Sequence, residues 1–207
     1  PAPVIGETLP DLLRVAAIYG PNAAGKSNLV QALNAVSLLA RNEPSVLQTP
    51  LPVWPFRFDA ALRDAPSRFE IHFIANGMRY SMEVASTAQR IVEERLTAYP
   101  RGKAKLLYER QRTGDAEVYQ FGDELEGGSD LHETWRKSTA ADALFLSRAV
   151  ANSNEEIEQL RHPLRWLTKT LHVILGNFTG WQSPVQSLLA KHPAFADEVV
   201  ELLKDVD

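Results

Sequence analysis

The stretch Tyr19-Gly20-Pro21-Asn22-Ala23-Ala24-Gly25-Lys26-Ser27-Asn28-Leu29 decides the fold expected for this chain of 207 residues. It contains Gly20-x-x-x-x-Gly25-Lys26-Ser27, which has the spacing of a phosphate-binding loop. Glycines let a chain wrap closely around a phosphate with several backbone N–H groups pointing inward. A helix that starts near Lys26 would direct its unpaired amides and the positive end of its dipole at the same anion.

The residues on both sides of the loop have the pattern that this motif requires. Residues 12–19 are apolar almost throughout, which is typical of a strand covered on both faces in a parallel sheet. After Lys26, apolar residues recur every three or four positions, which predicts a helix. These residues are Leu29, Leu33, Val36 and Ala40. Strand, glycine loop and helix in this order predict an α/β P-loop NTPase fold.

Each part of the loop has an expected role in holding a nucleoside triphosphate. Lys26 should reach the β and γ phosphates and serve catalysis, and the Ser27 hydroxyl should ligate Mg²⁺. We therefore expect ATP and Mg²⁺ as cofactors. The predicted cofactor-binding residues are Gly20, Pro21, Asn22, Ala23, Ala24, Gly25, Lys26, Ser27 and Asn28.

A different sequence pattern, the alternation typical of strands, follows the proline-rich connection after the first predicted helix. Apolar and polar residues alternate through residues 69–73 and again through residues 80–84, on either side of Asn76-Gly77, a strong hairpin signal. Similar runs at residues 91–99, 105–110 and 116–121 extend the pattern. We expect an antiparallel β subdomain over residues 56–121, inserted into the α/β body.

The remainder, residues 129–207, is expected to be mainly helical. An acidic, glycine-bearing loop should occupy residues 122–130, with helical pattern from residue 140. Ser153 and Glu156 fit a capping box, and Pro163 should break or kink the helix that follows. A short strand at residues 172–175 and a helix pair around His192-Pro193 complete the prediction.

Composition places broad limits on the function. The formal net charge is −4, so nucleic acid or an anionic membrane could be bound only through a local basic patch. The chain has no cysteine, which excludes disulfides and thiolate metal sites. No stretch reaches the roughly 20 apolar residues that span a bilayer. We expect one cytoplasmic domain over residues 1–207 with no membrane partner.

Beyond the phosphate loop, several landmarks occur in the order known from one group of bacterial ATPases. They are Pro55-Phe56-Arg57-Phe58, Phe69-Glu70-Ile71-His72-Phe73, Arg79-Tyr80, Ile91-Val92-Glu93-Glu94 and Ala143-Leu144-Phe145-Leu146-Ser147. With the loop, they resemble the N-terminal lobe of AAA_15/AAA_21-type ATPases, which are ABC-, SMC- and RecF-like and are often found in abortive-infection and anti-phage systems. The resemblance implies an ABC-type fold and a homodimer that closes around nucleotide, with an effector protein or DNA as a further partner.

The motifs of ATP hydrolysis are missing from the sequence. No four-residue apolar run ends in Asp-Glu, the Walker B pair that would hold the metal and orient water, and Gly127-Gly128-Ser129 has the wrong order for an ABC signature. In the resembling family these parts lie C-terminal to Asp207. We therefore expect an ATPase lobe that is inactive alone. The alternative is a nucleotide-gated DNA-binding or sensor module without turnover. A GTPase is disfavoured because the Asn-Lys-x-Asp and Asp-x-x-Gly motifs are lacking, and a small-molecule kinase because the predicted meander takes the place of the expected helical lid.

Weaker signals have simpler explanations. One basic cluster lies on a predicted hairpin and a second along a helix; either could contact DNA phosphates, although solvated surfaces are favoured. Gln48 is expected to be an exposed glutamine and not a metal-site residue, and the histidines lack metal-site spacing. Trp135, Trp166 and Trp181 are expected in the core or an interface. The basic clusters are Arg101, Lys103, Lys105, Arg110 and Arg112, and Arg161, Arg165 and Lys169.

Overall fold

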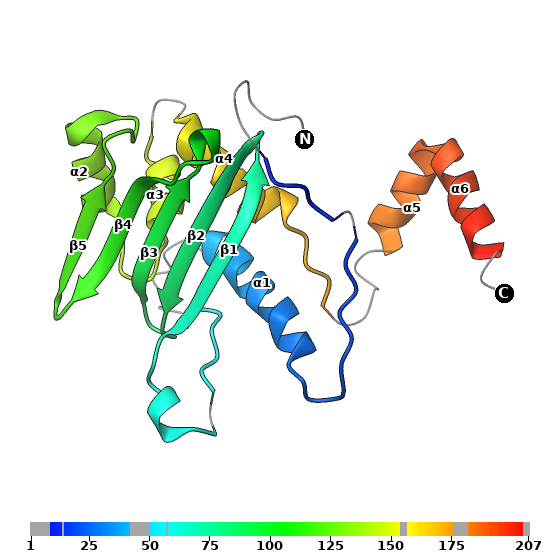
Figure 1. Cartoon of the computed structure of the whole chain (residues 1–207), viewed down its shortest axis with the longest axis horizontal. Helices are drawn as coiled ribbons and strands as arrows, with labels where there is room; N and C mark the ends of the chain where they lie inside the picture. The colour runs from blue at the N-terminus through cyan, green and yellow to red at the C-terminus, as the bar shows by residue number, and fades with distance from the viewer. Residues whose placement is uncertain are drawn as a thin grey trace. The chain divides into compact units, whose positions relative to one another are not determined.

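The structure, a computed structural model, describes residues 9–13, 15–41, 50–56, 58–153, 157–175 and 182–204. Contacts divide the chain into two compact units, Pro1–His172 and Val173–Asp207. In the first unit an antiparallel sheet has α1, α3 and α4 behind it (Figure 1). The predictions for Gln48, for the capping box with Glu156 and for Trp181 lie outside the described residues.

Five strands form a meander in which each strand pairs only with its neighbours in the sequence. All the pairs are antiparallel, which confirms the predicted sheet. Asn76 and Gly77 both have positive φ, at 48° and 77°, so the predicted two-residue turn is present between the first two strands. The strands are β1 Ser67–Ala75, β2 Met78–Ser86, β3 Ile91–Ala98, β4 Lys105–Thr113 and β5 Ala116–Phe121.

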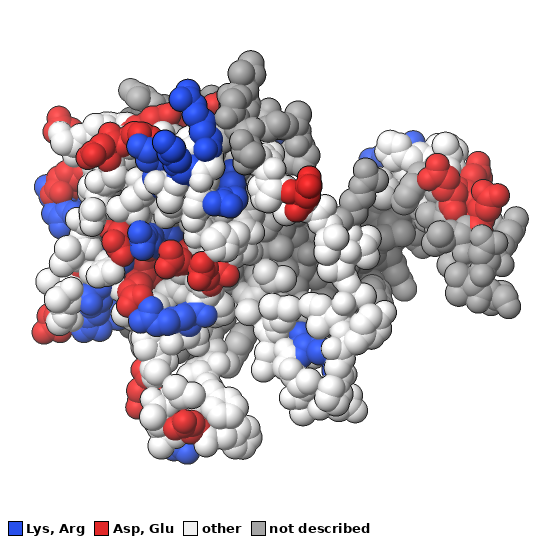
Figure 2. Space-filling model, viewed as in Figure 1, with Lys and Arg blue, Asp and Glu red and all other residues white. Residues whose placement is uncertain are grey.

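The two faces of the sheet differ in chemistry because side chains alternate along each strand. The face toward the helices carries the core, including Phe73, Met82, Leu96 and Tyr108. The register sets one row of charged residues across the other face: Glu70, Glu83, Arg95 and Glu109. Figure 2 shows this face with acidic and basic side chains interspersed, as expected of a solvated surface.

Helices cover the apolar face, and the first of them is only partly packed. Helix α1, Lys26–Arg41, buries Val36, Leu39 and Ala40 in its second half, whereas Leu29 near its start is 49% exposed. The other elements of this unit are α2 Gly128–Ser138, α3 Phe145–Ala151, α4 Glu158–Arg165, the 3₁₀ turns η1 Ala60–Leu62 and η2 Pro100–Gly102, and the π-helical turn η3 Trp166–Thr170.

Two boundaries differ from those predicted. Helix α2 already begins at Gly128, inside the predicted loop, with Gly127 in a left-handed conformation before it. Pro163 lies within α4, and the helix continues for two residues before it widens into the π turn η3. Proline lacks the N–H that would complete one hydrogen bond of this helix, yet the helix does not end at Pro163.

Two predicted strands are wrong as far as the structure describes them. Residues 12, 13 and 15–19 form no strand, and Leu13 and Tyr19 are 86% and 90% exposed. Residues 172–175 likewise lie outside any helix or strand. A strand requires a hydrogen-bonded neighbour, and the five-stranded sheet provides none for either segment.

The second unit contains the predicted helix pair. Helix α5, Gln182–Lys191, ends before His192, and α6, Pro193–Lys204, begins with the proline. Proline suits a first helical position because the N–H that it lacks would have no intrahelical partner there. Throughout the described part of the chain, every helix falls short of the length and apolar character needed for a bilayer crossing.

Candidate phosphate-binding site

The predicted phosphate loop forms a turn that leads directly into α1. The N–H of Ala24 donates to the carbonyl oxygen of Pro21 at 3.3 Å, and the N–H of Leu29 donates to that of Gly25 at 3.2 Å as the helix begins. Residues 20–25 therefore make up the loop, while Lys26, Ser27 and Asn28 lie in the first helical turn. All nine predicted residues lie in one continuous segment.

Lys26 closes this loop with its side chain. Its Nζ donates to the carbonyl oxygens of Gly20 and Pro21, both at 2.6 Å. None of the ion pairs formed by described residues includes Lys26, so within this part of the chain the ammonium is held by carbonyl oxygens. A neutral carbonyl is a weaker partner than an anion, and an incoming phosphate can replace it.

Two residues of the loop have left-handed backbone conformations, Ala23 with φ of 65° and Gly25 with φ of 86°. A Cβ added to Gly25 would meet no atom within 4 Å, so conformation and not crowding favours glycine there. Ala23 adopts the same region with a Cβ, which is unfavourable by about 1–2 kcal/mol. Left-handed residues in a loop are one of the backbone features from which anion-binding concavities are built.

Helix α1 is held at the end far from the loop. The buried Ser37 hydroxyl donates to the carbonyl oxygen of Leu167 in η3 at 2.8 Å. The Ser147 hydroxyl of α3 donates to the carbonyl oxygen of Ala40 at 2.7 Å. The phosphate loop and first helical turn are mostly exposed, so the site is an open loop on a helix whose other end is anchored.

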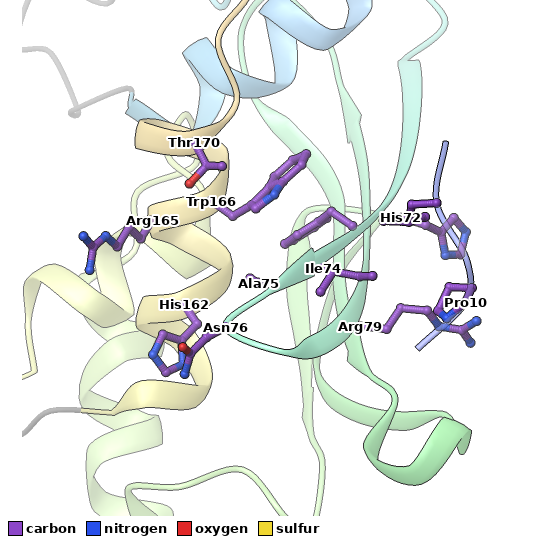
Figure 3. Close-up of a pocket in the computed structure, with 12 residues that line it drawn as sticks. Pro10, His72, Ile74, Ala75, Asn76, Arg79, His162, Arg165, Trp166 and Thr170 are labelled. Atoms are coloured by element: carbon purple, nitrogen blue, oxygen red, sulfur yellow. The ribbon is translucent and has the colours of Figure 1, made fainter. Parts of the chain in front are cut away.

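A cavity of about 670 Å³ lies elsewhere, at the β1–β2 turn. Figure 3 shows His72 and Arg79 on one side of this turn and His162 and Trp166 of the α4–η3 segment on the other. The Trp166 ring stacks on Phe73 at 4.4 Å between centroids, so it contributes to the core as predicted. No residue of the phosphate loop lines this cavity.

A buried polar network, which was not predicted from the sequence, lies between the sheet and α3. Glu94 is fully buried and accepts hydrogen bonds from the Tyr108 hydroxyl at 2.7 Å and from the N–H groups of Phe145 and Leu146 at 2.6 and 2.9 Å. Its carboxylate thus satisfies amides at the start of α3. Arg110 lies 3.9 Å from the same carboxylate.

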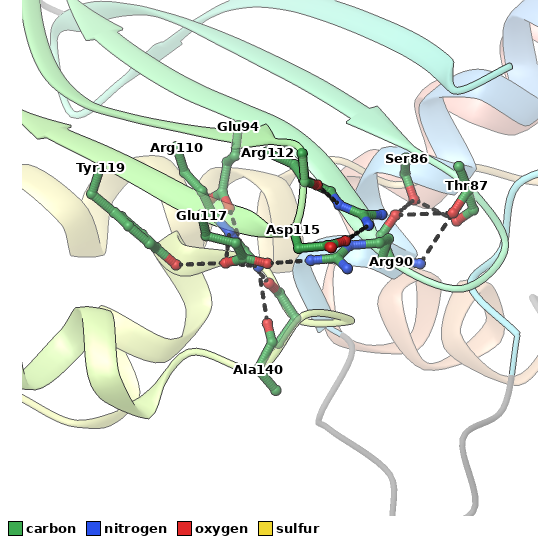
Figure 4. Close-up of polar contacts among 12 residues, drawn as sticks. Ser86, Thr87, Arg90, Glu94, Arg110, Arg112, Asp115, Glu117, Tyr119 and Ala140 are labelled. Carbon is green, nitrogen blue, oxygen red and sulfur yellow. Dashed lines mark hydrogen bonds and ion pairs between the residues drawn. The ribbon is translucent and has the colours of Figure 1, made fainter.

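Arg110 and Glu117 extend the network to the edge of the sheet (Figure 4). Arg110 donates to Glu117 at 2.9 Å and to the carbonyl oxygens of Ala143 and Ala140, and Arg90 donates to Glu117 at 2.6 Å. Burial opposes ionisation of Glu117, but the hydrogen bonds from Arg110 and then from Arg90 outweigh it and lower its pKa. The network fixes α3 and its preceding loop to the sheet and has no contact with the phosphate loop.

One of the three comparisons with known proteins found a match. A family model described as "AAA domain, putative AbiEii toxin, Type IV TA system" matches residues 15–167. The chain belongs to this family. The match includes the phosphate loop, α1, the whole sheet and α4. A search of curated proteins and a search of solved structures each found no match.

This AAA domain therefore combines α/β content with a five-stranded antiparallel sheet and helices, and its family is that of ATPase-like, nucleotide-binding modules. The buried polar network could have been found from the alternation of inward and outward side chains along β3 and β4. Glu94 and Arg110 both fall on the inward side of their strands, in phase with Leu96 and Tyr108. An inward charge indicates a buried partner, although it does not identify that partner.

Proposed function

We propose that this AAA domain binds Mg-ATP on the loop Gly20–Ser27 as the nucleotide-binding lobe of an ABC-type, SMC-like ATPase. The observation that carries the proposal is the position of the Lys26 ammonium, 2.6 Å from two loop carbonyl oxygens at the N-terminus of α1. The ammonium, the unpaired amides of the first turn of α1 and the helix dipole all favour a polyphosphate at the same place. Gly20 to Asn28 are the proposed binding residues, with Lys26 at the β and γ phosphates.

The proposed residues fit Mg²⁺ as well as phosphate. Ser27 follows Lys26 in the first turn of α1 and is exposed, so its hydroxyl would be available to hold Mg²⁺. When bound, Mg²⁺ would neutralise charge on the β and γ phosphates. The protein's part is to hold the nucleotide, since Lys26 and the loop amides attract phosphate in the ground state and in the transition state alike.

The connectivity supports the ABC-type part of the proposal. The antiparallel sheet comes after α1 and η1 in the chain, at the place expected of an inserted subdomain. We infer that the complete assembly hydrolyses ATP when two such domains close around nucleotide, and that it acts in a prokaryotic defence system. The alternative is a nucleotide-gated DNA-binding or sensor module, which would bind Mg-ATP equally well but show no turnover in the complete protein.

Replacing Lys26 with alanine tests the binding site directly. Lys26→Ala should weaken Mg-ATP binding at least about tenfold, because a charged hydrogen bond contributes about 1.5–3 kcal/mol. Isothermal titration calorimetry of the 207-residue chain would measure this. Lys137→Ala is the matched control, since Lys137 lies on α2 and pairs with Glu133 at 3.3 Å. Equal affinities for the wild type and Lys26→Ala would reject the site. Ser27→Ala should reduce only the increase in ATP affinity that Mg²⁺ provides.

A further inference from the structure

The sheet ends at β1 with an edge to which no further strand is paired. In the described part of the chain β1 pairs only with β2, and no backbone hydrogen bond from another segment reaches its outer side (Figure 1). The strand has nine residues in uninterrupted register, whereas β5 at the opposite edge has six. A long and regular edge strand is a template for pairing with another strand.

β1 lacks the features with which proteins usually protect such an edge. Its sequence, Ser67-Arg68-Phe69-Glu70-Ile71-His72-Phe73-Ile74-Ala75, contains no proline and no lysine, and its pairing with β2 has no bulge. Arg68 donates to Glu93 of β3 at 2.8 Å, so its charge is directed across the sheet and away from the edge. Hollow space adjoins the strand, because residues 72–75 line the cavity described above. The edge is therefore available to another strand.

The turn at Asn76-Gly77 determines which backbone groups of β1 point outward. In a two-residue hairpin the closing pair, here Ala75 and Met78, is hydrogen-bonded, and hydrogen-bonded pairs then alternate with non-hydrogen-bonded pairs along the strands. The backbone groups of the odd-numbered residues of β1 therefore bond to β2. Those of the even-numbered residues, from 68 to 74, face the free edge.

We propose that this edge binds the same edge of a second copy of the chain, antiparallel, with Ile71 facing Ile71 across the two-fold axis. In this register the outward backbone groups of one copy meet those of the other, because residue 70 lies opposite residue 72 and residue 68 opposite residue 74. About eight backbone hydrogen bonds join the two sheets into one. No residue of the proposed phosphate loop belongs to β1, so this interface goes beyond the proposed ATP site.

The side chains of β1 are self-complementary in this register. On the outer face Glu70 lies opposite His72 of the second copy, whose imidazole can donate a hydrogen bond to the carboxylate, and the axis repeats this contact. On the core face Phe69 lies opposite Phe73, with the two Ile71 side chains between the aromatic pairs. Phe69 and Ile71 are only half-buried in one copy, so apolar surface remains to be covered. With the axis at residue 70, Glu70 would oppose Glu70, which is unfavourable.

A single introduced cysteine tests the register, because the chain contains none. Ile71→Cys should form a disulfide-linked dimer on mild oxidation, since residue 71 meets its own copy at a Cα separation of about 4.5 Å, which a disulfide can span. Phe69→Cys, on the same face of the strand, is the matched control. It should not cross-link, because the two residues 69 lie more than about 13 Å apart. Denaturing gel electrophoresis without reductant would measure the linked fraction.

Exchange of the paired side chains tests the contact itself. Analytical ultracentrifugation of the 207-residue chain without nucleotide, up to about 100 μM, should show a reversible dimer, since one pair of strands makes a small interface. Glu70→Lys and His72→Glu should each raise the dissociation constant about 2- to 30-fold, because each removes the contact at two symmetry-related places. Glu70→Lys/His72→Glu should restore it, since the new lysine and glutamate face each other. Glu109→Lys, the same change in the same charged row but on the internal strand β4, should keep the wild-type value.

Three results would overturn the proposal. The first is a wild-type chain that circular dichroism shows to be folded but that stays monomeric at this concentration. The second is equal cross-linking of Ile71→Cys and Phe69→Cys. The third is a dimer that forms only with Mg-ATP and is lost in Lys26→Ala, which would assign association to the nucleotide site. Lys26→Ala should instead keep the nucleotide-free dimer, so this proposal and that of Mg-ATP binding can fail separately.

Discussion

The antiparallel sheet and the segment around the phosphate loop are stabilised in different ways. Each internal strand of the sheet is paired on both sides, and one face is covered by α1, α3 and α4. The segment of residues 15–19 has apolar side chains in solvent and no paired strand, and the loop after it is tied by Lys26 and by the start of α1. The proposed binding chemistry thus lies in the less packed of the two regions.

This difference means that stability and ligand binding should be separable by mutation. Substitutions in the sheet and its network should change the free energy of unfolding, because there they remove buried contacts. Substitutions in the loop should change affinity for nucleotide with little effect on folding, since little is buried there. Lys26→Ala is the clearest case of a loop substitution, since it should remove Mg-ATP binding and leave the free energy of unfolding nearly unchanged.

The largest effect on stability is expected for Glu94. Glu94→Ala should lower the free energy of unfolding by about 3–5 kcal/mol, because it leaves Arg110 without one of its buried partners and two amides of α3 unpaired. Urea denaturation followed by circular dichroism would measure the change. Glu94→Gln keeps an acceptor oxygen and should be less destabilising, and a loss below about 1 kcal/mol for Glu94→Ala would show that the network is not stabilising.

A second prediction compares the two halves of α1. Leu39 is 1% exposed and Leu29 is 49% exposed, although both are leucines of the same helix. Leu39→Ala should destabilise by about 2–5 kcal/mol through lost burial and a cavity, and Leu29→Ala by no more than about 0.5 kcal/mol. Urea denaturation of both variants would test this. Equal losses would mean that the start of α1 is packed in solution.

The pH dependence of stability gives a third, smaller effect. The pKa of Glu117 is lower in the folded state, so its contribution is fully present above the unfolded pKa of about 4.3 and is lost as pH falls through the folded pKa. Between about pH 7 and pH 3, Glu117→Gln should therefore flatten the decline in the free energy of unfolding. Glu126→Gln, at an exposed position, is the control. Identical pH profiles for wild type and Glu117→Gln would contradict this account.

The smallest effect is expected within the loop. Ala23→Gly should raise the free energy of unfolding by up to about 1 kcal/mol, because glycine adopts positive φ without strain. Ala24 is not among the residues with positive φ, so Ala24→Gly should instead lower stability by about 0.4–1 kcal/mol. Thermal denaturation would compare the two. Changes of the same sign would show that Ala23 is not strained.

The features that could be predicted from the sequence are those set by local chemistry. Alternation through β1 and β2 and the turn at Asn76-Gly77 predicted the sheet, and the spacing of leucines predicted α1. The apolar run at residues 12–19 indicates a strand only where neighbouring strands exist, and the described sheet provides none. Gly128 resembled part of a loop because glycine is a poor helix former, although the first position of a helix tolerates it.

In the candidate site and its surroundings, too, some features could be predicted from the local sequence and others depend on tertiary structure. The loop could be located from its glycines and Lys26, since their spacing is itself the chemistry of phosphate binding. The contacts of Glu94 with Phe145 and Leu146 could not, because they join residues about fifty positions apart through the packing of α3 on the sheet. Pairing of surface cations also depends on tertiary structure: Lys103 and Lys105 are both exposed, and the sequence does not show that Lys105 pairs with Glu124 at 2.6 Å.

The anchoring of α1 by Ser37 and Ser147 gives the helix a fixed pivot. Its 16 residues span about 24 Å, so a tilt of one degree about the anchored end moves the loop by about 0.4 Å. The chemistry of a reaction site is sensitive to a misplacement of about 1 Å. Two hydroxyl groups that lie far from the proposed phosphate site thus hold the pivot of α1, so a small displacement of α3 or η3 would be magnified at that site.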